Sequence, residues 1–337
     1  MTSLEGLDLD ALDRHLRAEG IARAGDLRAE LIAGGRSNLT FLVFDDASKW
    51  VLRRPPLHGL TPSAHDMARE YRVVAALAGT PVPVARAVTM RNDNSVLGAP
   101  FQMVDHVDGR VVRTAAELAA LGDQTVIDNC IDALIKALSD LHAVDPYAVG
   151  LGDFGKPDGY LERQVRRWGS QWEHVRLPDD ARDDDVRRLH AALADAVPPQ
   201  SGTSIVHGDY RIDNTVLDAE DATVVRAVLD WEMSTLGDPL SDAALMCVYR
   251  NPMFGHIHTD AAWSSDLVPP ADELADRYSK VSGRDLAHWD FYMALAYFKL
   301  AIIAAGIDYR RREGADGPEQ VGEAVAPMIA AGLAALG

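Results

Sequence analysis

The segment SIVHGDYRIDNTVLD (204–218) places a His, two acids, an Arg and an Asn within eight residues, directly after a short apolar run. Asp209 and Asn214 stand five residues apart, an order and spacing used in phosphoryl transfer. In that chemistry the Asp receives the proton of the acceptor hydroxyl and the Asn binds Mg²⁺. Little covalent chemistry is required of the protein, because alignment and neutralisation of the phosphate charge lower the barrier. The segment therefore predicts a catalytic loop for phosphoryl transfer.

A second metal ligand is expected soon after this loop, and VVRAVLDWE places Asp230 at the end of a β-branched run. The runs TVLD and TVVRAVLD flank the turn-prone AEDA and predict a hairpin. Such a hairpin brings Asn214 and Asp230 side by side, as a shared Mg²⁺ requires. The alternative is that Asp209 and Asp230 are only turn and cap residues. The order and spacing of loop, hairpin and acid favour the metal site.

The elements that must position these residues begin with a β-rich first third. Leucines spaced for one helical face predict a helix over 8–19, and Gly20 follows as a stop signal. Short runs bounded by Gly, Asp and Pro predict three consecutive antiparallel strands, in LRAELIAGG, NLTFLVFD and KWVLRRPP. A helix ending at Gly79 and two further strand-like runs, 84–90 and 100–105, follow. We expect a five-stranded sheet with a helix inserted in its sequence.

The rest of the chain is predominantly helical. In TVIDNCIDALIKALSDLHAV one apolar stripe predicts a helix, and it comprises Ile127, Ile131, Leu134, Leu138 and Leu141. The most apolar segment, 291–307, is interrupted by Lys299 and is shorter than the roughly 20 residues that a bilayer needs. We therefore expect a buried helix there.

Composition narrows the classes of partner and compartment. The net charge of −18, from 51 acids against 33 Lys plus Arg, repels nucleic acid and anionic lipid. The isolated Cys130 and Cys247 form no metal-binding pair and favour a reducing compartment. The opening MTSLEGLDLDAL lacks the basic and apolar regions of an export signal. We expect a cytoplasmic protein with no nucleic-acid, membrane or obligate protein partner.

A phosphate cradle is expected between the first two strands, where GGRSNLT stands. Gly34 and Gly35 let backbone N–H groups approach phosphate oxygens, and Ser37 and Asn38 add donors. The alternative is an ordinary hairpin turn. The cradle is favoured over the turn only because the motif HGDYRIDN follows downstream.

The third strand should carry a cation for the α- and β-phosphates, with an acid on the following helix to hold it. In KWVLRRPP the cation is Arg53, and Glu70 is its expected partner. Period-two alternation puts Val51 and Arg53 on one face, so that Val51 roofs the adenine while Arg53 reaches the phosphates. Lys49 shares that face and is the alternative. An Arg replaces the usual Lys here, which places the phosphate affinity in question.

HGDYRIDN, followed by LDWEMSTLGDPLSDAALM, resembles the aminoglycoside phosphotransferase superfamily of small-molecule kinases. REYRVVAAL, GYLERQVRRW and FKLAIIAAG resemble a narrower branch, found in bacteria and as the kinase-like domain of some acyl-CoA dehydrogenases. The resemblance implies an α+β, bilobal protein-kinase-like fold with a small antiparallel-sheet N-lobe and a mainly helical C-lobe. The expected divisions are the N-lobe 1–104, the hinge 105–108 and the C-lobe 109–337.

The resemblance also implies roles for single residues. Asp209 becomes the catalytic base, Asn214 and Asp230 bind Mg²⁺, and His207 supports the loop. Asp238 and Asp242 brace the loop, and the role of Glu232 stays open. In QMVDHVDG the backbone near Asp105 to Val107 is expected to bind adenine. The implied cofactors are ATP and Mg²⁺.

Arg211 has two interpretations. It follows the base by two residues, where an Arg can clamp phosphate oxygens with two parallel N–H donors. It is equally expected as a surface residue or as a partner of Asp213.

The acceptor is the least determined part. Aminoglycosides suit the acidic surface, whereas the narrower branch points to hydroxylated acyl thioesters, which are anionic. Arg163 and Arg167 share one face of a predicted helix and could hold a carboxylate or a CoA phosphate. Salt bridges to surrounding acids are the alternative interpretation of both.

Two other classes compete with an active kinase. A nucleotide-binding pseudokinase acting in acyl-CoA metabolism is supported only by Arg53. A metal hydrolase would need His and carboxylate clusters, and neither HExxH nor HxHxxD occurs. The absence of GxGxxG gives no support for flavin chemistry in this chain.

Overall fold

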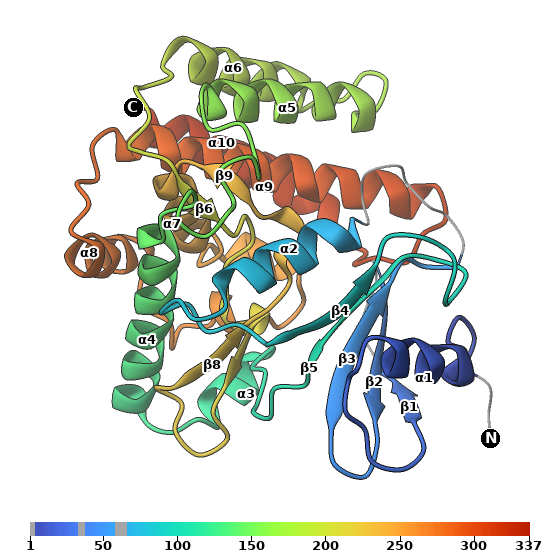
Figure 1. Ribbon diagram of the computed structural model, residues 1–337. Helices are drawn as coiled ribbons and strands as arrows, with labels where there is room; N and C mark the ends of the chain where they lie inside the picture. The colour runs from blue at the N-terminus through green and yellow to red at the C-terminus, as the bar shows by residue number, and fades with distance from the viewer. Residues whose placement is uncertain (1–3, 33–37, 58–65) are drawn as a thin grey trace. The chain divides into compact units, whose positions relative to one another are not determined.

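A five-stranded antiparallel sheet organises the first third of the chain (Figure 1). Its strands are β1 (Arg28–Leu31), β2 (Leu39–Phe44), β3 (Lys49–Arg54), β4 (Ala87–Arg91) and β5 (Phe101–Asp105). They pair in the order β1-β2-β3-β5-β4. The computed structural model describes residues 4–32, 38–57 and 66–337. The predicted meander and the two further strands are confirmed.

These residues form two compact units. Unit 1 comprises Met1–Asp108 and Arg226–Ser234, and unit 2 comprises Gly109–Val225 and Thr235–Gly337. The first boundary falls at the end of the predicted hinge. Residues 226–234 follow the catalytic loop in sequence but group with unit 1. The lobe and hinge roles themselves stay predictions.

One face of the sheet is buried under α1 (Leu9–Ala18). Asp8 caps this helix through its side chain, which accepts a hydrogen bond from the backbone N–H of Ala11. Alternate residues of the strands share a core with the helix: Leu12, Leu16, Phe41, Val43, Trp50, Leu52, Phe101 and Met103. Because side chains alternate across a strand, the residues between them face the other way. That second face is only half-buried and includes Val51 and Arg53.

Helix α2 (Met67–Leu77) lies between β3 and β4 in the sequence and packs against β4 and β5. Asp66 caps it by accepting from the backbone N–H of Arg69 at 2.9 Å. Its buried side includes Glu70, a charged residue among apolar neighbours. A buried acid needs a partner, which the site below supplies.

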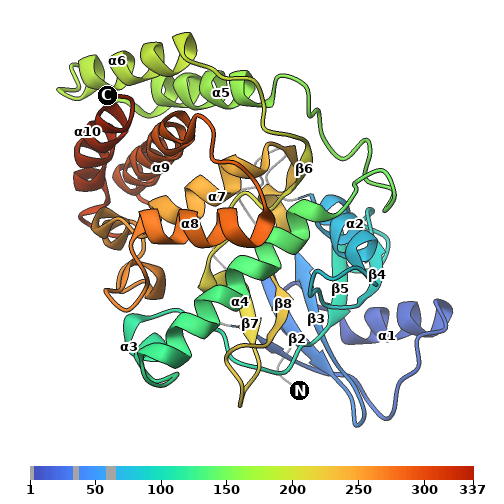
Figure 2. The same cartoon turned by 90° about the vertical axis from the view of Figure 1, so that its left-hand side faces the viewer.

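Unit 2 is mainly helical. Its longer elements are α3 (Ala115–Ala119), α4 (Gln124–Ala143), α5 (Tyr160–Val175), α6 (Asp183–Asp195), α7 (Pro239–Val248), α8 (Ala271–Ser282), α9 (Trp289–Arg312) and α10 (Val325–Ala335). Figure 2 shows α5 and α6 side by side, and α10 beside α9. All five members of the predicted apolar stripe on α4 are buried.

Short strands link these helices. β6 (Ser204–Val206) pairs with β9 (Thr235–Gly237), and β7 (Thr215–Leu217) pairs with β8 (Val225–Val228). Single-turn helices occur at η1 (Ile212–Asn214), η2 (Trp231–Met233), η3 (Pro252–His256), η4 (Ala262–Ser264) and η5 (Val321–Ala324). The pairing of β7 with β8 confirms the predicted hairpin.

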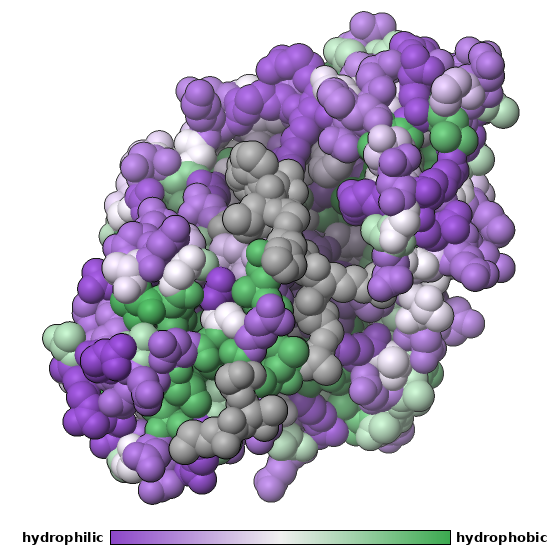
Figure 3. Space-filling model, turned by 90° about the vertical axis from the view of Figure 1, so that its right-hand side faces the viewer, coloured by the Kyte–Doolittle hydropathy of each residue, from purple (hydrophilic) through white to green (hydrophobic). Residues whose placement is uncertain are grey.

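Helix α9 is the apolar helix that the sequence predicts to be buried. It packs against α5, α7 and α10. Among the described residues it is the one helix long and apolar enough to cross a membrane by length and composition. However, 67% of its most apolar window is buried inside the protein. The surface seen in Figure 3 is mostly hydrophilic, as expected for a net charge of −18.

Candidate active site

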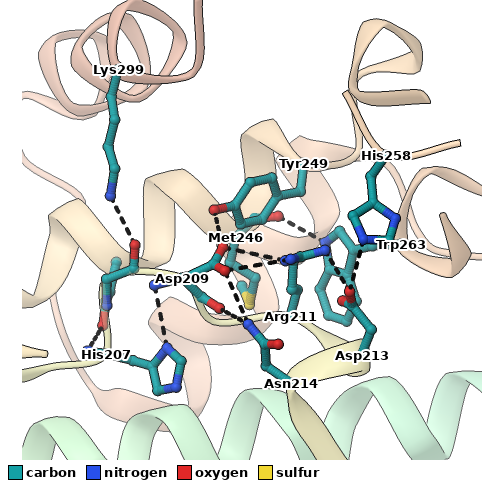
Figure 4. A network of polar contacts seen from close by, with 12 residues as sticks. His207, Asp209, Arg211, Asp213, Asn214, Met246, Tyr249, His258, Trp263 and Lys299 are labelled. Carbon is teal, nitrogen blue, oxygen red and sulfur yellow. Dashed lines mark hydrogen bonds and ion pairs between the residues drawn. The ribbon is translucent and has the colours of Figure 1, made fainter. Parts of the chain in front are cut away.

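The predicted catalytic loop begins after β6, at His207, and is held by its backbone (Figure 4). The carboxylate of Asp242, on α7, accepts the N–H groups of His207 and Gly208 at 2.5 and 2.8 Å. The carbonyl of Gly208 accepts a hydrogen bond from Nζ of Lys299 at 2.8 Å. Gly208 has φ +85°, a left-handed conformation that favours glycine. Helices α7 and α9 therefore fix the loop just before Asp209.

Asp242 is itself held by a buried network. Its Oδ2 lies 3.3 Å from Nε2 of His142 on α4, and Nδ1 of that ring lies 2.7 Å from the hydroxyl of Tyr278 on α8. Burial raises the pKa of Asp242, but the His142 hydrogen bond and the loop N–H donors outweigh it, so the pKa lies below its ordinary value. Burial also disfavours the charged form of His142, and it therefore lowers the pKa of that imidazole. These contacts support the brace role predicted for Asp242.

Asp238 holds a neighbouring segment. Its carboxylate caps α7 through the N–H of Leu240 at 3.0 Å and accepts the N–H of Ser201 at 2.7 Å. Ser201 precedes β6, so Asp238 fixes the approach to the loop rather than the loop itself. The contacts agree with a bracing role and give Asp238 no chemical one.

The Asp209 carboxylate is surrounded by donors. Oδ1 accepts from the Tyr249 hydroxyl and from Nε of Arg211, the latter at 3.2 Å. Oδ2 accepts from Nη2 of Arg211 at 3.4 Å and from Nδ2 of Asn214 at 3.1 Å. Burial raises the pKa of Asp209, but the Arg211 charge and the Tyr249 hydrogen bond outweigh it, so the pKa lies below its ordinary value. Asp209 is therefore an ionised acceptor at neutral pH.

Asn214 is oriented by the same loop. Its Nδ2 also donates to the backbone carbonyl of Asp209 at 2.8 Å, and the residue is buried at the end of η1. Within the described part of the chain no group donates to its Oδ1. An amide oxygen is a suitable ligand for Mg²⁺. The donor chemistry of Asn214 thus fits the predicted metal role.

Arg211 pairs with Asp213, as one interpretation expected, and also with Asp209. Its Nη1 donates to Asp213, while its Nε and Nη2 donate to Asp209. The guanidinium lies 5.6 and 5.5 Å from the ring centroids of Tyr249 and Phe254. The side chain is 13% exposed, so it is no ordinary surface residue. A phosphate contact by Arg211 stays a prediction.

His207 contacts the loop as a support. Its Nδ1 accepts the backbone N–H of Asp209 at 3.2 Å, and its ring is fully buried against Tyr210. The ring therefore contacts the Asp209 backbone and not its carboxylate. This geometry agrees with a structural role.

In unit 1 the half-buried face of the sheet is built in rows. The register aligns Leu42, Val51 and Val104 across three strands, and all three apolar residues are half-buried. The next row aligns Thr40 with Arg53 and Gln102, which are polar. Leu42 and Val104 were not singled out in the sequence, because their alignment with Val51 depends on strand pairing.

Arg53 lies in a half-buried polar cluster in which only Glu70 and Gln102 are fully buried. Its Nη1 is 3.0 Å from Oε2 of Glu70, and its Nη2 is 3.4 Å from Oδ1 of Asp230. Gln102 donates to the same Glu70 oxygen at 2.6 Å. Burial alone would lower the pKa of Arg53, but Glu70 and Asp230 raise it above its ordinary value. Burial raises the pKa of Glu70, which Arg53 opposes only in part. The predicted Arg53–Glu70 pair is present.

Asp230 is held in a left-handed backbone conformation, with φ 61° and ψ 61°. Such a conformation is uncommon for a residue with a side chain. Its carboxylate is 36% exposed and keeps an oxygen beyond the one near Arg53. The carboxylate chemistry fits a Mg²⁺ ligand.

Along β3, Lys49 lies two residues before Val51, whereas Arg53 lies two residues after it. It is 57% exposed and lies 3.8 Å from Asp108. No contact joins it to Glu70 in the described residues. The geometry favours Arg53 over Lys49 as the phosphate ligand.

The predicted hinge backbone is partly used by the sheet. The N–H groups of Asp105 and His106 donate to the carbonyls of Arg86 and Lys49 at 2.9 and 3.0 Å. The Asp105 carboxylate pairs with Arg86 at 2.6 Å. Among the described residues no acceptor is found for the N–H of Val107, so this donor is available to a base.

The predicted phosphate cradle cannot be placed in full. Gly34, Gly35 and Ser37 lie outside the described residues. Asn38 is described and is buried. The cradle therefore stays a prediction from the sequence.

A cationic cluster lies beside the catalytic loop on α5 and α9. The ring centroid of Trp168 is 5.2 Å from the Arg167 guanidinium and 5.8 Å from Nζ of Lys299. In the described chain neither cation forms an ion pair, and the buried Nε1–H of Trp168 has no acceptor. Arg163 instead donates to the backbone carbonyls of Lys156 and Asp158. Arg163 and Arg167 both lie on α5, and their role in binding an acceptor stays a prediction.

Two residues that contact the loop, Lys299 and Tyr249, were not predicted from the sequence as site residues. Lys299 left a visible signal, since it interrupts an otherwise apolar helix. Tyr249 left none, because it stands 40 residues from Asp209 without a recognisable motif.

Comparison with known proteins identifies the family. Residues 28–295 match the model of the phosphotransferase enzyme family, and the chain belongs to that family. It is 32% identical to acyl-CoA dehydrogenase family member 11 of Homo sapiens, over 96% of this chain and 42% of that protein. It is 33% identical to family member 10 of Mus musculus, over 90% of this chain and 28% of that protein. The chain spans less than half the length of these relatives.

Solved structures confirm the fold. A Ralstonia eutropha protein, provisionally named an aminoglycoside phosphotransferase, is 32% identical with a TM-score of 0.83, and 98% of each chain is covered. A mutant of aminoglycoside phosphotransferase APH(4)-Ia, in complex with ADP and hygromycin B, is 14% identical with a TM-score of 0.64. This match covers 96% of this chain and 97% of the other, and shows the fold alone. The predicted α+β kinase-like fold and family are therefore confirmed.

Proposed function

We propose that this protein is an ATP- and Mg²⁺-dependent kinase that transfers the γ-phosphate to a hydroxyl of a small molecule. The observation that carries the proposal is the Asp209 carboxylate, ionised and oriented by Arg211 and Asn214 on a loop braced by Asp242. Membership of the phosphotransferase enzyme family supports the same reaction class.

The sheet face of unit 1 supports the nucleotide assignment. The apolar row of Leu42, Val51 and Val104 offers a flat surface for adenine. The N–H of Val107, which has no acceptor among the described residues, offers a donor. One row further along, the Arg53 guanidinium, held by Glu70, supplies the positive charge proposed for the α- and β-phosphates. Along β3, the apolar row proposed for adenine is thus followed by the polar row proposed for the phosphates.

Asn214 and Asp230 are the residues proposed to hold Mg²⁺. They supply oxygen donors, which this hard cation prefers. When bound, the ion neutralises charge on the phosphate oxygens. Phosphate oxygens and water would complete the ligand set, since Mg²⁺ sites in kinases use few protein ligands.

The proposed chemistry at Asp209 is orientation followed by proton uptake. The acceptor oxygen forms a bond to the γ-phosphorus, the bond from that phosphorus to the β-phosphate oxygen breaks, and ADP leaves. The hydroxyl proton passes to Asp209. Because the pKa of Asp209 lies below its ordinary value, the carboxylate takes the proton late, after the hydroxyl has become acidic.

The cationic cluster favours a hydroxyacyl-CoA-like acceptor over an aminoglycoside. Arg167 is exposed and forms no ion pair with a described carboxylate, and Lys299 donates to the carbonyl of Gly208, next to Asp209. Burial lowers the pKa of Lys299, which the charges of Asp242 and Asp209 oppose only in part, so Arg167 is the firmer positive charge of the two. A cationic aminoglycoside would be repelled there, whereas a carboxylate or phosphate would be attracted. Aminoglycosides remain the competing acceptor class.

A pseudokinase role in acyl-CoA metabolism is the alternative function, and its support is weakened. The support for a pseudokinase was the replacement of the usual Lys by Arg53. Arg53 nevertheless pairs with Glu70, and active kinases need such a cation–Glu pair.

Measurement of ADP release tests the proposal. Hydroxyacyl-CoAs, aminoglycosides, choline and sugars would each be offered with ATP or GTP and Mg²⁺, and Asp209→Asn is the control. Acceptor-dependent release by the wild type alone, highest with hydroxyacyl-CoAs, is expected. Nucleotide binding without turnover on any acceptor would favour the pseudokinase.

A further inference from the structure

The Asp209 carboxylate has no vacant position for an acceptor hydroxyl. A carboxylate accepts about four hydrogen bonds, and four donors from Tyr249, Arg211 and Asn214 are already present. An acceptor can therefore reach Asp209 only if one donor is displaced.

Tyr249 is the donor whose displacement breaks the fewest hydrogen bonds. Arg211 is tied to Asp213 as well, and Asn214 is tied to the Asp209 carbonyl, so their displacement breaks further contacts. The Tyr249 hydroxyl has no second hydrogen bond in the described chain. It is also neutral, so its exchange for an alcohol replaces one O–H donor by another and leaves the ion pair intact.

The surroundings of Tyr249 keep its hydroxyl on Asp209 and exclude water. The residue follows α7, is 3% exposed and packs on Phe254 with ring centroids 4.7 Å apart. The Arg211 guanidinium lies over the same ring. A buried phenol on the oxygen that would receive a proton is a barrier to water as well as a hydrogen-bond donor.

We propose that Tyr249 occupies the acceptor position on Asp209 and thereby suppresses hydrolysis of ATP by water until an alcohol displaces it. The inference rests on the proposed kinase function. Tyr249 acts through Asp209 and is a positioning residue that selects alcohol over water. In the suppressed reaction, a water oxygen bonds to the γ-phosphorus, ADP leaves, and the water proton passes to Asp209, giving ADP and phosphate.

The test compares two tyrosines that both donate to a carboxylate. Tyr249→Phe removes the hydroxyl and keeps the ring. Tyr292→Phe is the matched control, because Tyr292 is equally buried and its hydroxyl donates to Asp238 at 2.9 Å. ADP and phosphate release without acceptor, and phosphoryl transfer with it, are measured at saturating Mg²⁺–ATP. Tyr249→Leu is a second variant in case Tyr249→Phe does not fold.

Only the Tyr249 variants should hydrolyse ATP faster, by about two- to tenfold, which corresponds to the net loss of one ordinary hydrogen bond. Their ratio of transfer to hydrolysis should fall by the same factor, while that of Tyr292→Phe stays at the wild-type value. Transfer by the wild type with unchanged or slower hydrolysis in folded Tyr249 variants overturns this inference alone. Absence of phosphoryl transfer by the wild type to every acceptor overturns both proposals.

Discussion

At the scale of single residues, charge and hydrogen bonding decide what Asp209 can do. Its donors hold the carboxylate ionised and in one orientation, which suits alignment of a hydroxyl more than removal of its proton from the ground state. Arg53 shows the same principle on the half-buried face of the sheet. Its two acids keep it charged in a partly desolvated position where a lone cation would be costly.

Asp209→Asn should lower phosphoryl transfer by at least about 100-fold, the usual minimum for loss of a general base. The amide cannot take the proton, but its size leaves the loop contacts largely in place. ATP binding, measured by calorimetry, should stay close to wild type. Near-normal turnover would show that another group receives the proton.

Arg53→Ala should lower kcat/KM for ATP about tenfold or more, as expected for a lost charge-assisted hydrogen bond. Arg53→Lys should recover only part, because a point charge replaces a planar fork. Glu70→Ala should be milder and should add little to Arg53→Ala, since residues acting as one unit are not additive. Lys49→Ala is the control on the same strand. A silent Arg53→Ala with a damaging Lys49→Ala would reverse the assignment.

At the scale of elements, the catalytic loop depends on three helices that are distant from it in sequence. Helix α7 supplies Asp242, α4 supplies His142 and α9 supplies Lys299. The strand that precedes the loop, β6, is only three residues long, so it offers few backbone hydrogen bonds to hold the loop. Its geometry is therefore set by side chains from packed helices.

Asp242→Asn should lower the free energy of unfolding by at least about 2 kcal/mol at pH 7, since buried loop donors lose a charged acceptor. Because the pKa of Asp242 is lowered from 3.8 by folding, its contribution is present above that value. The contribution is lost as the pH falls through the lower folded pKa. Denaturant titrations should therefore show the gap between wild type and variant closing below about pH 4. A gap that stays constant to pH 2.5 would contradict this account.

At the scale of the whole molecule, strong negative charge coexists with local positive charge at the loop. The net charge of −18 attracts Mg²⁺ in general, whereas the exposed guanidinium of Arg167 favours an anion locally. Binding of a ligand to the folded chain alone stabilises that chain against unfolding, which makes thermal stability a readout of binding.

Saturation with Mg²⁺–ATP at 100 times its Kd should stabilise the protein by about 2.7 kcal/mol. Asn214→Ala and Asp230→Ala should each remove the Mg²⁺-dependent part of that stabilisation. Asp230→Ala should be the more damaging, because a charged ligand is lost. Asp221→Ala, in the exposed turn between β7 and β8, is the control. Thermal shifts with and without Mg²⁺ measure the effect, and equal Mg²⁺ dependence in all four proteins would exclude this metal site.

The sequence by itself determined the features that depend on local pattern. Periodicity predicted α1, α4, the five strands and the β7–β8 hairpin, because the alternation of apolar residues reflects which side of an element is buried. The spacing of HGDYRIDN and the alternation in KWVLRRPP also singled out Asp209, Asn214 and Arg53, since each motif lies within one short segment.

Tertiary structure alone decided which distant groups meet these residues. Tyr249 reaches Asp209 across 40 residues, Lys299 reaches Gly208 across 91, and Asp230 reaches Arg53 across 177. The row of Leu42, Val51 and Val104 likewise depends on strand register. No local pattern encodes such contacts, because they arise when separate helices and strands pack to bury their apolar faces. The sequence therefore singled out the candidate reacting groups, and tertiary packing determined which residues contact them.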